Sequence, residues 1–257
     1  MVSDTIHEFV ARSAVRRAVL HAVADGGATT DDLLAAVEGS RSAVYKAVDA
    51  LSEAGLVVHG DDDLATTGLG DVVAGRLADR ERVARLLDGD GYWESHDASV
   101  LPTPFRRRLP ALADAEVVES PDTYPTRARA RAKSLLSSAE RVDAFLTVRD
   151  PERADALTGR ASGARTRVVL DESLSPADSG VSASEDGVSV RAGDAPCALC
   201  VTDDALLVQL PHLDGTFDDQ SFLLARTDPA LAWGRDYFEF GWQSATVPPE
   251  ETAVSSR

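Results

Sequence analysis

In the first part of the chain, residues 5–90, segments with helical periodicity are separated by glycines. From residue 5 to 24 the apolar residues recur with a helical period, and Gly26-Gly27 ends the segment. Thr30 is placed to cap a short second helix, which turns at Gly39. Ser40 is placed to cap a third helix over residues 41–54, and Gly55 follows as a left-handed stop. Because the connections are short, we expect the three helices to pack against one another.

A two-stranded ribbon and a long helix are expected next. Residues 56–58 and 64–66 are short apolar strands, and residues 59–63 form a polar hairpin turn between them. Thr67 then opens a helix that runs to about Leu87. This order of three helices, ribbon and helix predicts a winged helix-turn-helix over residues 1–90. The apolar row of the long helix offers a packing seam for a homodimer: Val72, Val73, Leu77, Val83, Leu86 and Leu87.

The start of the third helix carries the polar residues that such a motif places in the major groove of double-stranded DNA. Val44, Val48 and Leu51 form its inner face. The predicted DNA-binding residues are Ser40, Arg41, Ser42, Tyr45 and Lys46. The alternative is a small helical subdomain with an ordinary polar face. The wing tip, residues 61–63, is three aspartates, so we do not expect the wing to hold the phosphate backbone.

The composition indicates a highly saline environment. The 43 acidic residues outnumber the 26 basic ones, and the net charge is −17. Lys46 and Lys133 are the only lysines. An acidic, lysine-poor surface is typical of a protein from a halophile. High salt weakens the contribution of counterion release to DNA binding, so the negative net charge does not exclude DNA as a binding partner. The N-terminal residues include Asp4 and Glu8, whereas a signal peptide begins with a basic region. No apolar run nears the ~18 residues of a membrane span. We therefore expect a cytoplasmic protein without membrane association.

Beyond a change in composition near residues 88–91, strands and helices alternate. Strands are expected at residues 115–119, 142–148, 165–170, 188–191, 197–201, 205–210 and 221–226. Helices are expected at 126–139, from Asp150-Pro151 onward, and from Asp228 to about Trp242, with a polar loop at 178–187. The fold class is therefore α/β overall, with the winged helix-turn-helix followed by a mixed α/β effector-binding or dimerisation domain over residues 91–247. We expect helices on both faces of the sheet in this second domain. Residues 248–257 are expected to form a flexible tail.

No catalytic, cofactor or metal site is predicted in this second domain. Cys197 and Cys200 have the spacing of a metal or redox pair, but they face opposite sides of a strand, so two buried structural cysteines are favoured. The five histidines are scattered singly. No nucleophile-elbow, phosphate-loop or dinucleotide-binding motif occurs.

One basic helix face is a candidate effector site. Residues 91–145 carry as many basic as acidic residues, unlike their acidic flanks. Arg127 and Arg131 lie on one side of the predicted helix over 126–139, where they could bind a small anionic effector. The alternative is a solvated face that forms ion pairs with neighbouring acids.

Several segments resemble archaeal winged-helix transcriptional regulators of the FilR and TrmB-like groups. In the first domain these are AVRRAVLHAVADG, SRSAVYKAVDALSEAGLVV and LATTGLGDVVA, and in the second LPALADAEVV, CALCVTDDALLVQL and SFLLARTDPALAWGRDYFEFGW. The resemblance implies a DNA-binding domain joined to a sensor domain, generally in a homodimer. It also relates the sensor's fold to phospholipase D, but the HxK nuclease signature is absent. A transcriptional regulator, not an enzyme, is therefore the first hypothesis. The alternatives are an α/β enzyme of phospholipase D-like fold whose N-terminal helices only mediate assembly, and a regulator whose second domain only dimerises.

Overall fold

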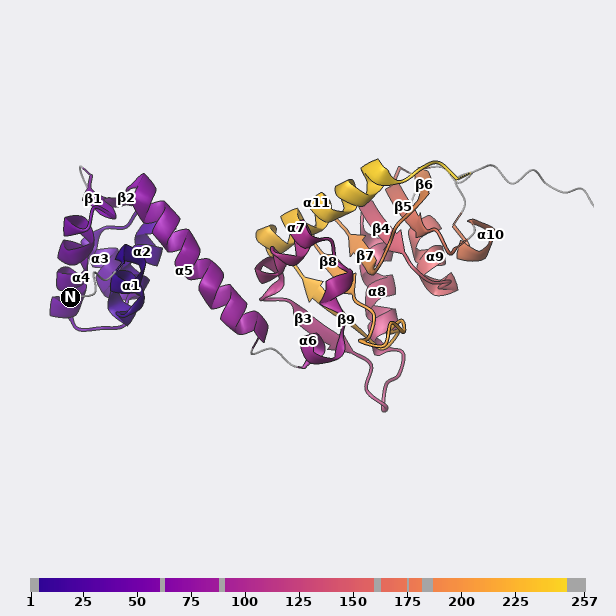
Figure 1. Cartoon of the computed structure of the whole chain (residues 1–257), viewed down its shortest axis with the longest axis horizontal. Coiled ribbons are helices and arrows are strands. Elements are labelled where there is room, and N and C mark those ends of the chain that lie inside the picture. The colour runs from indigo at the N-terminus through magenta and orange to yellow at the C-terminus, as the bar shows by residue number, and fades with distance from the viewer. Residues whose placement is uncertain are drawn as a thin grey trace, which may run out of the picture. The chain divides into compact units, whose positions relative to one another are not determined.

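The computed structural model describes residues 5–60, 63–87, 91–159, 163–174, 176–181 and 187–248. The chain divides into two compact units, Met1–Ala84 and Arg85–Arg257. Figure 1 shows a helical unit with a small ribbon and a unit built on one large sheet. The predicted fold class, a winged helix-turn-helix followed by a mixed α/β domain, is confirmed at the level of the two folds.

The first unit contains five helices and a ribbon among its described residues. The helices are α1 (Ile6–Ala11), α2 (Ala14–Ala24), α3 (Thr30–Ala36), α4 (Arg41–Glu53) and α5 (Gly68–Leu87), and β1 (Val57–His59) pairs antiparallel with β2 (Leu64–Thr66). One core, which includes Leu20, Leu33, Leu51 and Leu77, lies between the helices and the ribbon. The helix-turn-helix is thus α3 and α4, packed on α2.

Two predicted helix boundaries in this unit are wrong. The single helix expected over residues 5–24 is two helices, because the Ser13 hydroxyl accepts a hydrogen bond from the Arg16 amide at 3.3 Å and starts α2. Likewise Thr29, not Thr30, caps α3, and its side chain and that of Asp32 bond reciprocally to each other's backbone amides. The apolar period of residues 5–24 continues through the first of these caps, and at the second cap two adjacent threonines are available.

The apolar side chains that α5 exposes differ from those expected from the sequence. The apolar residues expected to form one packing seam are divided: Val73 and Leu77 are buried in the core of the first unit, whereas Val72 is 61% exposed. Consecutive residues of a helix point about 100° apart, so Val72 and Val73 cannot share a face. The side chain of Leu87, also expected in that seam, lies outside the described residues.

In the part of the second unit that the structure describes, seven strands form one mixed sheet in the order β3-β9-β8-β7-β4-β5-β6. Its strands are β3 (Glu116–Glu119), β4 (Arg141–Leu146), β5 (Arg165–Asp171), β6 (Val188–Gly193), β7 (Ala198–Val201), β8 (Leu206–Gln209) and β9 (Ser221–Ala225). Strands β4, β5 and β6 are parallel, as their helical crossovers require, and the later strands form an antiparallel meander.

Helices cover both faces of this sheet (Figure 1). On one face α11 (Asp228–Ser244) packs with short helical segments, and its Trp233, Tyr237 and Phe238 lie in the core there. Those segments are α6 (Tyr92–Ser95), α7 (Thr103–Arg106) and the 3-10 turns Ala98–Val100 and Leu109–Leu112. On the other face lie α8 (Arg127–Ser138) and α9 (Pro151–Thr158), with Ala132 and Leu157 in a second core. The short helices between residues 92 and 112 were not predicted.

Some expected features lie wholly or partly outside the described residues. These are Asp61 and Asp62 of the wing tip, the break at 88–90, part of the polar loop at 178–187, and 249–257 of the tail. Within that loop, residues 178 and 179 belong instead to α10 (Pro176–Ser179). Asp150 caps α9 as predicted, with its carboxylate accepting from the Arg153 amide at 3.1 Å.

Candidate functional site

The exposed face of α4 presents the predicted DNA-binding residues. The Ser40 hydroxyl accepts a hydrogen bond from the Ala43 amide at 3.2 Å, so this residue caps the helix. Arg41, Ser42 and Lys46 are exposed, and Tyr45 is 45% exposed. Behind them Val44, Val48 and Leu51 are buried in the core of the first unit. The polar residues are thus carried by a packed helix, and none of them serves the core.

The ribbon exposes two side chains that the sequence pattern did not single out. Only the first residue of β1, Val57, is buried, whereas Val58 is 48% exposed and His59 is also exposed. The ribbon is held by its pairing with β2, in which Val57 lies opposite Thr66. Side chains alternate along a strand, so the burial of Val57 places Val58 in solvent. An apolar side chain at a solvent-facing position could have been noticed from the sequence.

In the second unit, Arg127 and Arg131 lie on the exposed face of α8. The opposite face of that helix, Ala128, Ala132 and Leu136, is buried against the sheet. A hollow beside α8 is lined instead by Arg129 and Lys133 of α8 and Arg153 of α9, together with acidic residues. Its volume is about 10 Å³, which admits one water molecule. Arg127 and Arg131 are not among the residues that line this hollow.

Cys197 and Cys200 are both free and buried, and they lie on opposite faces of the sheet. Burial raises the pKa of the Cys197 thiol to about 12, and burial also raises the pKa of Cys200. The predicted burial of both cysteines is confirmed, and two thiols on opposite faces of a sheet are not placed to bind one metal ion together.

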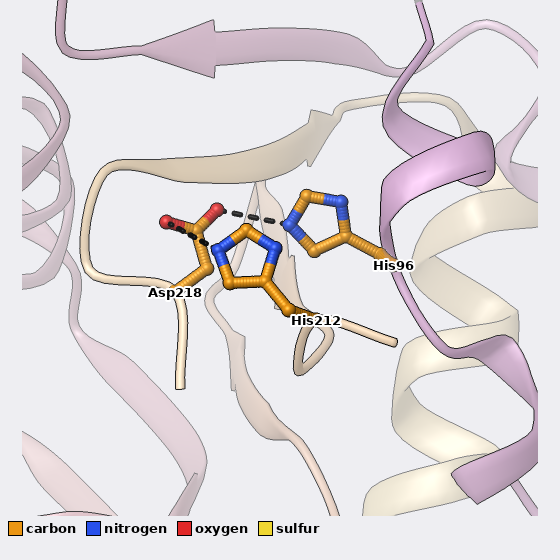
Figure 2. Close-up of side chains that lie close together, drawn as sticks. All are labelled: His96, His212 and Asp218. Carbon is orange, nitrogen blue, oxygen red and sulfur yellow. Dashed lines mark hydrogen bonds and ion pairs between the residues drawn. The ribbon is translucent and has the colours of Figure 1, made fainter. Parts of the chain in front are cut away.

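A cluster that sequence reasoning missed lies at one end of β8. Figure 2 shows His96, His212 and Asp218 with their side chains converging. Nε2 of His96 lies 2.9 Å from Oδ2 of Asp218, and Nε2 of His212 lies 3.9 Å from Oδ1. The donor atoms of all three residues lie within 4.8 Å of one another. Two imidazoles and a carboxylate at this spacing could hold a divalent metal ion.

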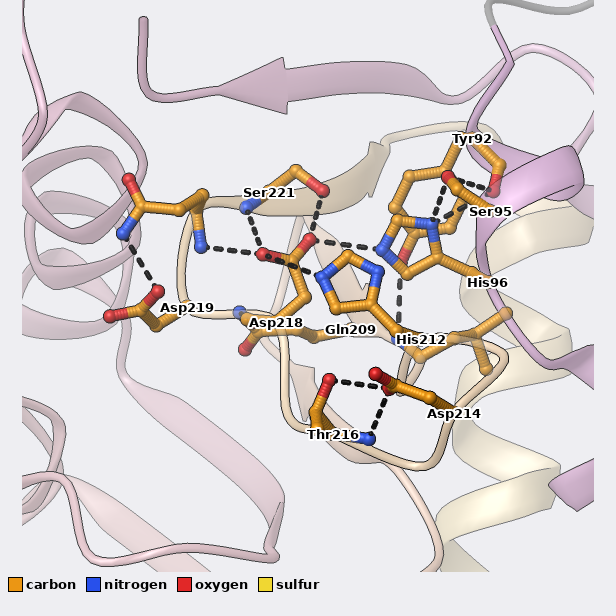
Figure 3. Close-up of polar contacts among 12 residues, drawn as sticks. Tyr92, Ser95, His96, Gln209, His212, Asp214, Thr216, Asp218, Asp219 and Ser221 are labelled. Carbon is orange, nitrogen blue, oxygen red and sulfur yellow. Dashed lines mark hydrogen bonds and ion pairs between the residues drawn. The ribbon is translucent and has the colours of Figure 1, made fainter. Parts of the chain in front are cut away.

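The surroundings of the cluster fix its two buried members (Figure 3). The His96 ring stacks on Tyr92 with ring centroids 3.8 Å apart, and its Nδ1 lies 2.8 Å from the Tyr92 carbonyl oxygen. Burial by itself would raise the pKa of Asp218. The Ser221 hydroxyl, the Gln220 amide and His96 all bond its carboxylate and together hold that pKa below the ordinary value. Asp218 is therefore a fixed carboxylate anion.

The backbone explains why these residues meet and why the sequence did not reveal it. His96 and His212 form an isolated antiparallel bridge, in which the Asp97 amide donates to the Pro211 carbonyl at 2.8 Å and the Leu213 amide donates to the Ser95 carbonyl at 3.1 Å. This bridge joins the end of α6 to the β8–β9 loop, two segments more than a hundred residues apart in the chain. Metal-ligand motifs are recognised by short spacing, which is absent here.

Comparison with known proteins relates the first unit to a described family. Residues 5–87 match the family model of the HVO_A0261 N-terminal domain. Over 228 residues the chain is 25% identical to the methanogenesis regulatory protein FilR1 of Methanothrix harundinacea (strain 6Ac), a match that covers 82% of this chain. The resemblance to FilR-like regulators is confirmed. The chain spans about half, 50%, of the length of that curated relative.

Solved structures resemble the chain more distantly. The archaeal chromatin protein TrmBL2 is 17% identical, with a TM-score of 0.40, covering 96% of this chain and 100% of that one. Nuc, a phospholipase D family member from Salmonella typhimurium, is 14% identical with a TM-score of 0.39, covering 51% of this chain and 95% of its own. Likenesses at these scores carry no functional argument. Among the described residues, no helix combines the length and the apolar character needed to cross a lipid bilayer.

Proposed function

We propose that the chain is a transcription regulator that binds double-stranded DNA through the exposed face of α4. The observation that carries this proposal is the separation of the two faces of that helix. Arg41, Ser42, Tyr45 and Lys46 project from its first turns, and the buried residues behind them hold the helix in place. An α-helix fits the major groove of B-DNA, where arginine and lysine donate to the acceptors on guanine.

The curated relative supports the same role. FilR1, which aligns with 82% of this chain, is named a regulatory protein. Regulation rather than catalysis is the function we assign, in the cytoplasm. The exposed Val58 and His59 of β1 extend the proposed DNA contact from α4 onto the ribbon. An apolar side chain in a groove contacts the thymine methyl group.

A homodimer is the second part of the proposal. Winged-helix proteins commonly bind two half-sites about one helical turn apart, which requires two copies of the reading helix. On α5 the side chains of Leu69 and Val72 are 47% and 61% exposed, one turn apart on the same side. We propose this pair, in place of the longer seam expected from sequence, as part of the dimer contact. The second unit then contributes further dimer contacts or binds a small anionic effector near Arg127 and Arg131.

The test is selection of bound sequences from a pool of randomised duplexes by the full chain at high salt. The expected result is an enriched motif with two related half-sites. Arg41→Ala and Tyr45→Ala should then bind the enriched duplex more weakly than the parent. Arg76→Ala, which removes an exposed cation on α5, is the matched control and should bind as the parent does. Equal binding by all four proteins would show that α4 does not read the DNA.

A further inference from the structure

We propose that His96, His212 and Asp218 bind a divalent transition-metal ion of the zinc class. The site lies in the second unit and is independent of the DNA-binding proposal. Three properties of the cluster support it: the direction of its donor atoms, the contacts that fix them and their access to solvent.

The hydrogen bonds of His96 direct a lone pair toward Asp218. Nδ1 of His96 lies 2.8 Å from the Tyr92 carbonyl oxygen, and because a carbonyl only accepts, Nδ1 must carry the hydrogen. In a neutral ring Nε2 then has a lone pair, and this atom lies 2.9 Å from Oδ2 of Asp218. Two acceptors at that distance need either a second ring proton or a metal ion to join them. A histidine that donates its second ring nitrogen to a backbone carbonyl is the usual arrangement of a metal ligand.

The carboxylate of Asp218 is held in place independently of His96. Oδ1 accepts from the Gln220 amide at 2.7 Å and from the Ser221 amide at 3.3 Å, and Oδ2 accepts from the Ser221 hydroxyl. The Gln209 side chain also donates to the Asp218 carbonyl. Figure 3 shows these bonds around the carboxylate. Such outer contacts fix a ligand before an ion arrives, which lowers the cost of binding.

His212 supplies the third donor and the route of entry. Its ring stacks on His96 with centroids 4.7 Å apart, and its side chain is 41% exposed, whereas those of His96 and Asp218 are each 4% exposed. Ligands at about 2.1 Å from one ion lie roughly 3.0–3.4 Å apart. The 2.9 Å between His96 and Asp218 meets this closely. The 3.9 Å from His212 to Asp218, in a cluster whose donor atoms all lie within 4.8 Å, requires the exposed His212 ring to turn toward the other two ligands.

The donor set selects the class of ion. Two imidazole nitrogens and one carboxylate oxygen suit zinc, cobalt and nickel, whereas calcium and magnesium prefer sets composed of oxygen alone. With three protein ligands, water completes the coordination on the exposed side of His212. A bound ion would also tie the β8–β9 loop to the end of α6, beside the backbone bridge described above.

The experiment uses the full chain, stripped with a chelator and dialysed. Zinc and cobalt are titrated separately, and retained metal is counted after gel filtration. The expected result is one ion per chain at micromolar concentrations, with a visible cobalt absorption typical of nitrogen and oxygen ligands. His212→Gln, at the exposed position, should weaken binding at least about tenfold, and Asp218→Asn should do the same. His59→Gln replaces an exposed histidine of the first unit and should leave binding unchanged.

Two results would overturn the proposal. Failure of the parent to retain either ion would mean that a proton alone joins His96 to Asp218. Equal losses in His212→Gln and His59→Gln would mean that the metal binds at surface histidines in general. The circular dichroism of His212→Gln should match the parent, and if it does not, Asp218→Asn with a native spectrum decides the case.

Discussion

Gly70 lies so close to Leu56 that a Cβ atom at position 70 would overlap the Leu56 carbonyl oxygen. The same oxygen accepts a hydrogen bond from the Thr67 amide at 3.0 Å, and the Thr67 hydroxyl accepts from the Gly70 amide at 3.0 Å. The first turn of α5 is thereby set against the chain that enters β1. This contact joins the ribbon to the long helix of the first unit.

Gly70→Ala should therefore destabilise the first unit. The added methyl group meets backbone rather than a movable side chain, so we expect a loss of about 3 kcal/mol in the free energy of unfolding. Gly75→Ala is the matched control: it lies on the same helix with no atom within 4 Å of its Cβ position. That variant should gain about 0.5–1 kcal/mol from helix propensity. Denaturant titration followed by circular dichroism measures both, and a stable Gly70→Ala would contradict the packing described.

Arg41→Ala and Lys46→Ala should weaken DNA binding in different ways. Loss of a bidentate contact from Arg41 to guanine should cost about 1–3 kcal/mol and relax the preference at one base position. Loss of Lys46 should weaken all sequences about equally and reduce the salt dependence by about one unit of slope. Fluorescence anisotropy with the selected duplex and a scrambled one, across a range of salt, separates the two effects.

Val48→Asp provides the contrasting outcome on the same helix. Val48 is 4% exposed, so the substitution places an unpaired charge in the core, and we expect the first unit to unfold. Loss of DNA binding in this variant should therefore accompany a loss of helical signal, whereas Arg41→Ala should keep the parent spectrum. A native spectrum for Val48→Asp would mean that α4 is not anchored as described.

The dimer should depend on the exposed apolar pair of α5. Val72→Asp should shift the mass measured by light scattering at high salt from two chains toward one, because a carboxylate there would be desolvated in the contact. Arg82→Ala, on the same helix but more than about 90° around it from the midpoint of that pair, should leave the mass unchanged. A parent protein that is monomeric across micromolar concentrations would rule out the dimer.

Arg131→Ala tests the proposed effector site on α8. If an anionic effector binds there, loss of one cation should lower its affinity by roughly tenfold, and Arg127→Ala should act similarly. Thermal-shift assays with a panel of phosphorylated and carboxylated metabolites measure this, with Arg235→Ala on α11 as the control. If the three variants bound every metabolite with equal affinity, Arg127 and Arg131 would belong to an ordinary solvated helix face and not to an effector site.

The two thiols should be unreactive in the folded protein. Cys197 and Cys200 are 2% exposed, and the pKa of Cys197 is raised to about 12, so at pH 8 neither position offers an accessible thiolate. A colorimetric thiol reagent should detect no thiol in the native chain and both after denaturation. Fast reaction of the native protein would contradict the burial described.

Local signals predicted much of the fold. Ser40 at a helix start, Gly55 at a helix end and a ribbon of two short strands depend on neighbours in the chain, and these predictions agree with the structure, although the first strand is Val57–His59 and not residues 56–58. The cysteine interpretation succeeded because side chains alternate along a strand whatever surrounds it. The helix expected over residues 5–24 was wrong because apolar periodicity continues through Ser13, where a side-chain cap starts a new helix.

The metal-ligand cluster could not be predicted from local signals. His96 precedes Asp218 by 122 residues, and the backbone bridge between the end of α6 and the β8–β9 loop brings them to 2.9 Å. No residue near His96 in the sequence indicated its partner. Likewise the row of α5 that faces solvent depends on what the first unit packs against it. Contacts of this kind depend on how distant segments are arranged in the fold, and the apolar periodicity of a single segment carries no information about that arrangement.

The position of β3 at an edge of the sheet has a consequence for biosynthesis. Its hydrogen-bonded neighbour is β9, in which Val117 pairs with Leu223. During translation β3 leaves the ribosome well before β9 exists, and every intervening strand is made while it waits. An unpaired strand edge is a template for association with other chains. The nascent sheet therefore passes through a stage at which its first strand must be shielded, and the two glutamates that bound β3, both exposed, supply charge where that shielding is needed.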